Sequence, residues 1–133
     1  MKTDYQGNLN LNKDLRNIDY TPPTNLYLAL STTPISKDGT GIVEPSKSYG
    51  YSRVAIPIGS TSWSVPSQGI SYNNIDIQFP EATNSWGTIV AVALFDAETG
   101  GNMRYYEALP SAKVVQQNAT FMFKTGALKF VIN

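Results

Sequence analysis

The sequence predicts a mainly β protein, a single-domain antiparallel β-sandwich or jelly-roll-like barrel with a short N-terminal helix or arm. Three observations support this fold class. About seven or eight short apolar or alternating segments are separated by turn residues, helical periodicity occurs only near the N-terminus, and the chain of 133 residues shows no internal repeat. We therefore expect an arm over residues 1–20 and a β-sandwich domain over residues 21–133.

The expected helix rests on one apolar stripe. Leu11, Leu15 and Ile18 recur at the i, i+4 and i+7 positions that share one helix face. This spacing predicts a short amphipathic helix from Asn10 to Asn17, with Asn10 as its N-cap. A terminal segment is ordered only when it is tied down. The stripe either packs on the sheet of its own subunit or docks on a neighbouring protein, and both alternatives remain open at this stage.

Beyond the two prolines at positions 22 and 23, the chain is typical of strands and turns. The expected strands are Asn25–Ser31, Tyr51–Ile58, Ile75–Phe79, Ile89–Phe95, Met103–Ala108, Ala119–Lys124 and Gly126–Ile132. The segment Ile89–Phe95 is apolar throughout, which predicts a strand buried on both faces. Pro57 indicates a strand that lies at an edge or ends there, and Thr125-Gly126 predicts the turn between the last two strands.

Two stretches rich in Ser, Thr, Pro and Gly predict long surface loops, at Thr32–Tyr49 and at Gly59–Gly69. Trp63 and Val65 are the isolated apolar residues of the second stretch. We expect both of them to pin that loop to the core.

Composition excludes several kinds of site. The chain has no cysteine and no histidine, which removes disulfides, thiol catalysis, the commonest general base and the commonest transition-metal ligand. Ten basic and ten acidic residues give a formal net charge of zero, so nucleic acid is not an expected partner. No apolar segment reaches the roughly 20 residues that span a bilayer, and the N-terminus lacks the apolar stretch of a signal peptide. We expect no membrane partner, and synthesis in a cytoplasm.

Carboxylates are the remaining candidates for chemistry, because a pair of them can hydrolyse a glycosidic bond. The acidic residues considered for this role are Asp76, Glu81, Asp96, Glu98 and Glu107. Glu81 and Asp96 lie beside turns, where carboxylates usually cap or solvate the chain, and no calcium-loop spacing is present. We therefore predict no catalytic, cofactor-binding or metal-binding residue.

The aromatic residues divide into two groups. All five phenylalanines lie in apolar or alternating segments, which predicts that they belong to the core. Tyrosine and tryptophan also carry a polar group and are enriched at interfaces. Tyr49, Tyr51, Trp63 and Tyr105 are therefore candidate contacts to a partner protein or a glycan. Tyr105 and Tyr106 are adjacent in an expected strand, so we expect their side chains on opposite faces.

Four segments carry a resemblance that covers nearly the whole chain in order. They are TPPTNLYLALSTTP (Thr21–Pro34), EPSKSYGYSRVAI (Glu44–Ile56), FPEATNSWGTIVAVALFDAETGGNMRYYEAL (Phe79–Leu109) and TGALKFVIN (Thr125–Asn133). As a set, they resemble a family of small virion structural proteins of tailed bacteriophages, variously described as minor tail, fibre or head-decoration proteins.

The resemblance implies a non-enzymatic structural protein of the virion, made in the bacterial host cytoplasm. It implies a capsid decoration, fibre or tail component that associates with copies of itself, with a trimer as the expected state, and docks on another virion protein. The alternative is a receptor-binding module that presents the loops Ser36–Tyr49 and Ser60–Gly69 to a host cell-surface glycan. Solvent-facing tyrosines clustered at a loop end would favour receptor binding, and exposed aliphatic residues along the arm would favour assembly.

Overall fold

The computed structural model describes residues 1–133 and is mainly β, with antiparallel strand pairing throughout and one α-helix. The elements are α1 (Asp4–Arg16), β1 (Asn25–Ser31), the 3₁₀ helix η1 (Lys47–Tyr49), β2 (Val54–Pro57), β3 (Ile70–Tyr72), β4 (Ile77–Gln78), β5 (Gly87–Phe95), β6 (Met103–Val115), β7 (Met122–Phe123) and β8 (Lys129–Val131). The predicted fold class is confirmed, although several strands are shorter than their sequence patterns indicate.

One layer is a four-stranded sheet in the order β2-β1-β5-β6. The central strand β5 is buried along almost all of Ile89–Phe95, as its unbroken apolar run predicts. The edge strand β2 ends at Pro57, which has no amide hydrogen to donate to a further strand. Along β1 the alternation of side chains places Leu28 and Leu30 on one face and Ala29 on the other.

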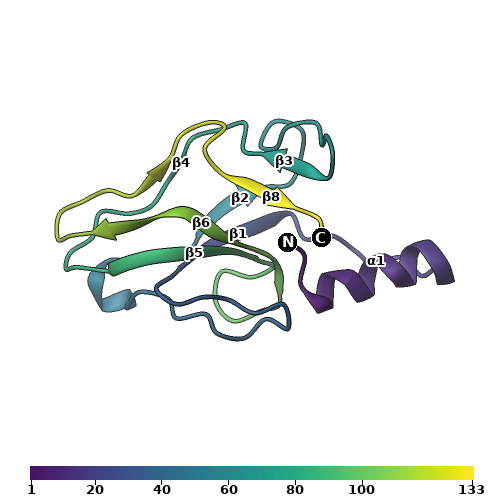
Figure 1. Cartoon of the computed structure of the whole chain (residues 1–133), viewed down its shortest axis with the longest axis horizontal. Coiled ribbons are helices and arrows are strands. Elements are labelled where there is room, and N and C mark those ends of the chain that lie inside the picture. The colour runs from purple at the N-terminus through teal and green to yellow at the C-terminus, as the bar shows by residue number, and fades with distance from the viewer.

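Two short ladders, β3–β8 and β4–β7, form a second layer over the face that carries Leu28 and Leu30 (Figure 1). The main core lies between these layers and has aromatic rings at its centre. The ring centroid of Tyr51 lies 5.4 Å from that of Trp86 and 6.3 Å from that of Phe79. Four of the five phenylalanines are buried and the fifth packs against this core, which confirms their predicted role.

The opposite face of the four-stranded sheet carries a smaller core. Its buried members are Ala29, Ala93, Phe95, Met103 and Tyr106. The long loop after β1 covers them, because Ile35 and Ile42 pack against this cluster. Tyr105 packs on the main core instead, so the predicted division of the Tyr105-Tyr106 pair between two faces is confirmed.

The structure corrects the predicted pairing of the last two strands. The turn at Gly126 forms, with φ of +82°, but β7 pairs with β4 and β8 pairs with β3, so the last two strands do not form a hairpin. The buried side chain of Asn73 explains the separation. Its amide group donates to the carbonyl oxygen of Lys124 at 3.0 Å and accepts the amide hydrogen of Leu128 at 2.9 Å. Asn73 thus holds open the wider turn that directs the two strands to different partners.

In the loop between β2 and β3, the sequence predicts that Trp63 and Val65 both pack on the core, and only Trp63 does so. Trp63 packs on the core, with its ring centroid 5.8 Å from that of Phe130. Val65 is 89% exposed and pins nothing, so that part of the prediction is wrong. The ring of Trp63 and the hydrogen bonds of Ser64 with Ser71 and Tyr72 hold this loop.

The helix begins at Asp4 rather than at Asn10. Thr3 is the N-cap, because its hydroxyl oxygen accepts the backbone amide hydrogen of Gln6 at 3.2 Å. The helix ends at Arg16, and Asn17 follows in the left-handed conformation with φ of +55°, close to the predicted end. Figure 1 shows α1 projecting from one end of the two sheet layers, with both chain termini near its base.

Candidate functional site

The first three residues attach the helix directly to the edge of the sheet. The amide of Thr3 donates to the carbonyl oxygen of Arg104 at 3.0 Å, and the amide of Tyr106 donates to that of Met1 at 2.9 Å. Lys2 lies opposite Tyr105 in this antiparallel bridge. Residues 1–3 therefore act as a short fifth strand on the outer edge of β6, and α1 starts from that edge without a flexible linker.

Thr3 is buried and joins the helix to β6 through its side chain as well. The hydroxyl group donates toward the carbonyl oxygens of Met103 at 2.7 Å and Arg104 at 3.1 Å. The same oxygen caps the helix by accepting the amide hydrogen of Gln6. One hydroxyl group thus satisfies groups on both the helix and the strand, and this limits rotation of the helix about its first turn.

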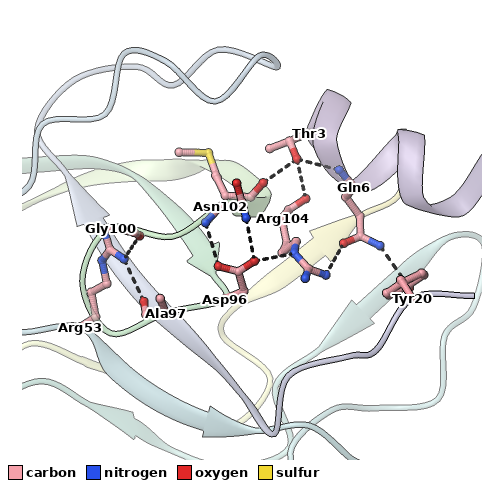
Figure 2. Close-up of polar contacts among 10 residues, drawn as sticks. Thr3, Gln6, Tyr20, Arg53, Asp96, Ala97, Gly100, Asn102 and Arg104 are labelled. Carbon is pink, nitrogen blue, oxygen red and sulfur yellow. Dashed lines mark hydrogen bonds and ion pairs between the residues drawn. The ribbon is translucent and has the colours of Figure 1, made fainter.

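Gln6 and Arg104 form the second connection (Figure 2). Nη1 of Arg104 donates to Oε1 of Gln6 at 3.1 Å, and its Nε donates to Oδ2 of Asp96 at 3.2 Å. The amide nitrogen of the Gln6 side chain donates to the hydroxyl oxygen of Tyr20 at 3.3 Å, where the chain returns from the helix to the sheet. We call Thr3, Gln6, Asp96 and Arg104 the helix anchor.

Asp96 belongs to the turn between β5 and β6, and this turn is itself held firmly. Burial alone would raise the pKa of Asp96, but hydrogen bonds from Asn102 and the charge of Arg104 outweigh it and lower the pKa. On the other side, Arg53 donates from Nη1 to the carbonyl oxygens of Ala97 and Gly100, at 2.9 Å each. The anchor therefore rests on a rigid hairpin.

Beyond its first turn the helix leaves the protein surface. Gln6 is the only buried residue of α1. Leu11, Leu15 and Ile18 are 56%, 77% and 44% exposed, so the apolar stripe does not pack on the chain's own sheet. Ile18 donates its amide hydrogen to the carbonyl oxygen of Asn12 at 2.9 Å, which closes the last turn of the helix. The base of the helix is fixed, and the stripe is open to a partner.

The other candidate contact residues lie in three different environments. Tyr51 is only 4% exposed and belongs to the main core, so it is not accessible to a partner or a glycan. Its hydroxyl group donates to Glu44 at 2.5 Å and accepts the amide hydrogen of Leu30 at 3.1 Å. Tyr49 is exposed at the end of η1. Trp63 and Tyr105, far apart in the sequence, line the same pocket.

Phe130 is the residue that brings Trp63 and Tyr105 together. Its ring centroid lies 5.8 Å from that of Trp63 and 6.3 Å from that of Tyr105. The sequence pattern identifies Phe130 as a core residue and gives no sign that one side of its ring faces a pocket. Thr3, Gln6 and Arg104 are also absent from the predicted site, although Thr3 and Gln6 have the spacing of a capping box.

The acidic side chains considered for catalysis take part in holding loops. Asp76 accepts the amide hydrogen of Thr125 at 2.8 Å and its hydroxyl hydrogen at 3.0 Å, and these bonds lower the pKa of Asp76. Glu107 accepts the amide hydrogen of Val131 at 2.9 Å. No three acidic side chains gather where they could share a metal ion. Asp76 and Glu107 therefore hold the chain's own backbone.

The single α-helix is too short and too polar to cross a membrane.

Comparisons with known proteins identify the family to which the chain belongs. A comparison with curated proteins finds no significant match. The family model described as Podophage GP4 fiber I protein gp80 matches residues 1–131, and the chain therefore belongs to this phage fibre family.

Proposed function

We propose that this chain is a non-enzymatic component of a phage fibre that assembles into the particle through contacts of α1 with a partner chain. Membership of a phage fibre family confirms the resemblance to tailed-phage virion proteins and supports a structural role in the virion. The observation that carries the proposal is the contrast within α1, whose base is held by the helix anchor while its apolar stripe is uncovered.

The energetics of the helix support a docking role. An isolated helix shorter than about 12–15 residues is marginal in water, and α1 has 13 residues. The anchor stabilises only its first turn. Leu11 and Leu15 therefore gain most by burial against a partner, at roughly 25 cal/mol per Å² of apolar surface removed from water.

The exposed residues favour assembly over receptor binding. The exposed tyrosines are Tyr5, Tyr49 and Tyr72, on α1, η1 and β3 respectively, and they form no cluster at a loop end. The exposed leucines of the arm, Leu11 and Leu15, in contrast, share one helix face, and Ile18 follows just beyond the end of the helix. A glycan-binding face needs aromatic platforms together with several hydrogen-bonding groups, and the arm exposes a single aromatic ring, that of Tyr5.

A non-enzymatic role agrees with the state of the carboxylates. Hydrolysis of a glycosidic bond needs one protonated and one ionised carboxyl group, separated by about 5–10 Å across an accessible cleft. Asp76 and Asp96 have lowered pKa values and accept hydrogen bonds from the chain itself. Neither is suited to donate a proton at neutral pH.

Incorporation into virions tests the proposal. We would introduce Leu11→Gln and Leu15→Gln together, which removes the stripe and keeps good helix formers, into the phage that encodes the chain. The matched control is Val65→Gln, at an exposed aliphatic residue outside the arm. We expect the double variant to fold, by circular dichroism, and to fall at least about tenfold in purified particles by quantitative mass spectrometry.

Equal incorporation of the double variant and the control would contradict the proposal. Point substitutions are preferable to deletion of residues 1–19, because deletion also removes Thr3 and uncovers the edge of β6. A glycan screen of the purified chain provides the competing outcome. Binding that the double variant retains and Trp63→Ala loses would support the receptor-binding alternative.

A further inference from the structure

Residues of β1, β3, β5, β6 and β8 line a pocket of about 250 Å³. Figure 1 shows β3 and β8 at the same end of the molecule as α1 and both chain termini. The residues that form the apolar walls of the pocket are Leu26, Trp63, Ile70, Tyr105, Phe130 and Ile132. Ile132 is 58% exposed and stands at the rim.

The chemistry of these walls selects an apolar occupant. Ser71 is one of the few polar residues at the pocket, and its hydroxyl group already donates to the carbonyl oxygen of Ser64 at 2.9 Å. The Tyr105 hydroxyl and the Trp63 indole N–H are the remaining side-chain donors. A sugar would lose its hydrogen bonds to water without replacing most of them. An aliphatic side chain, in contrast, would exchange water for contacts with Trp63 and Phe130.

Lys2, a cation without an ion pair, is the neighbour of the pocket-lining residue Tyr105. Lys2 lies directly opposite Tyr105 in the antiparallel bridge, so the two side chains lie on the same face of the sheet. Lys2 forms none of the ion pairs of the structure. Its ammonium group is therefore available to a carboxylate that approaches with the occupant of the pocket.

The apolar stripe of α1 carries the complementary charge. Asp14 lies three residues after Leu11 in α1, so the two side chains are neighbours on the helix surface. Like Lys2, Asp14 forms no ion pair. The stripe thus has a carboxylate beside its aliphatic residues, and the largely apolar pocket has the ammonium group of Lys2 beside its Tyr105 wall.

The two features do not meet within one chain. Leu15 is the most exposed residue of the stripe at 77%, and the helix anchor ties the base of α1 to β6. Because both features lie at one end of the molecule, two or more copies can bring the stripe of each onto the pocket of another, as a two-fold dimer or a closed ring.

We propose that the pocket receives α1 of a second copy of this chain, with Leu15 entering between Trp63 and Phe130 and Asp14 facing Lys2. This inference rests on the proposed function and names the partner of the helix. Leu11 and Ile18 then cover the rim around Ile132.

Light scattering after size exclusion tests this contact, over protein concentrations up to on the order of 1 mM. We expect the wild-type chain to self-associate and both Leu15→Asp and Ile132→Asp to be monomeric. The matched control is Val65→Asp, in the loop beside the pocket but outside its walls, and it should associate like the wild type. Circular dichroism confirms that each variant is folded.

Mixing provides a sharper readout. Leu15→Asp keeps an intact pocket, and Ile132→Asp keeps an intact helix, so one complete contact can form between them. We expect these two monomeric variants to form a 1:1 complex when mixed. In the wild type, docking should also shift the emission maximum of Trp63 as the protein concentration rises. The fluorescence of Trp86, which is buried in the core, should stay constant.

Charge exchange tests the orientation. Lys2→Glu and Asp14→Lys should each weaken self-association by about fivefold, the effect expected of one exposed ion pair. The double variant should recover most of that loss, because the pair is restored with reversed signs. A double variant weaker than both single variants would overturn the proposed facing of Asp14 and Lys2.

The remaining outcomes separate this inference from the proposed function. A wild-type chain that stays monomeric at every concentration overturns the self-docking contact. If Ile132→Asp enters phage particles normally while Leu15→Asp does not, α1 docks on a different virion protein, so this inference fails and the proposed function stands. If both variants enter particles normally, the proposed function fails as well.

Discussion

Arg104 and Asp96 form an ion pair that joins the N-terminal helix to the central hairpin of the sheet. Nε of Arg104 lies 3.2 Å from Oδ2 of Asp96, and Nη1 of the same guanidinium donates to Gln6 at 3.1 Å. The Arg104 side chain is buried, and that of Asp96 is 15% exposed. The direction in which α1 leaves the protein therefore depends on one side chain of β6.

Arg104→Met should lower the free energy of unfolding by about 3 kcal/mol, because it leaves the carboxylate of Asp96 buried without its cation. The aliphatic replacement keeps most of the packing volume, so the loss reports mainly on the polar contacts. Urea unfolding measures the change. Amide hydrogen exchange should also become faster in α1, since the guanidinium no longer holds Gln6.

Lys113→Met is the control for this change, since Lys113 is an exposed cation on the same strand and forms no ion pair. We expect its free energy of unfolding to stay within about 0.5 kcal/mol of the wild type. Equal losses in the two variants would mean that the ion pair with Asp96 is not what holds the helix.

Stability should depend on the charge of Asp96 at acid pH. The pKa of this carboxyl is lower in the folded chain than its ordinary value of about 3.9. Its contribution to stability is therefore complete above about pH 4 and is lost as the pH falls through the folded pKa. Asp96→Asn should flatten this part of the acid branch, measured by urea unfolding from about pH 5 to about pH 2.

Other carboxylates do not obscure this comparison. The pKa values of Glu44 and Asp76 are also lowered, but both groups are unchanged in the variant and contribute equally to the two curves. The informative quantity is the difference between wild type and variant at each pH. Parallel curves across the whole range would contradict the assigned role of Asp96.

The sequence predicts those parts of the fold that depend on local alternation. Leu28 and Leu30 alternate with Ala29, and the run from Ile89 to Phe95 is apolar without a break, so both strands are predicted correctly. The partners of the last two strands depend on Asn73, whose side chain bonds to residues more than 50 positions further along the chain. A contact of this kind leaves no periodic pattern.

The candidate site, like the fold, has parts that the sequence predicts and parts that it does not. The stripe of Leu11 and Leu15 is visible as a helical period, and its exposure agrees with a docking role. The helix anchor is not visible, because Arg104 and Gln6 are 98 positions apart and each is an ordinary polar residue in sequence. Tyr51 has the composition of an interface residue, but Glu44 and the amide of Leu30 satisfy its hydroxyl group inside the core.

Tyr51→Phe should lower the free energy of unfolding by about 1–2 kcal/mol, measured by urea unfolding. Burial raises the pKa of the Tyr51 hydroxyl and the carboxylate of Glu44 raises it further, so this phenol stays protonated and donates to Glu44. The substitution keeps the ring but leaves the amide of Leu30 without its acceptor. Tyr49→Phe, at an exposed ring, should change stability by less than about 0.5 kcal/mol.

Gly101→Ala should destabilise the chain more than Gly100→Ala, although both glycines lie in the left-handed region with φ of +72° and +62°. Each substitution carries the conformational cost of about 1–2 kcal/mol. A Cβ at position 101 would also lie 2.6 Å from Oδ1 of Asp96, whereas a Cβ at position 100 meets nothing within 4 Å. Gly101→Ala therefore displaces the carboxylate that binds Arg104.

The double variant of Gly101→Ala and Arg104→Met tests this link between the hairpin and the helix anchor. Its loss in free energy of unfolding, measured in urea, should be less than the sum of the losses of the two single variants. Fully additive losses would show that the hairpin and the helix anchor are independent.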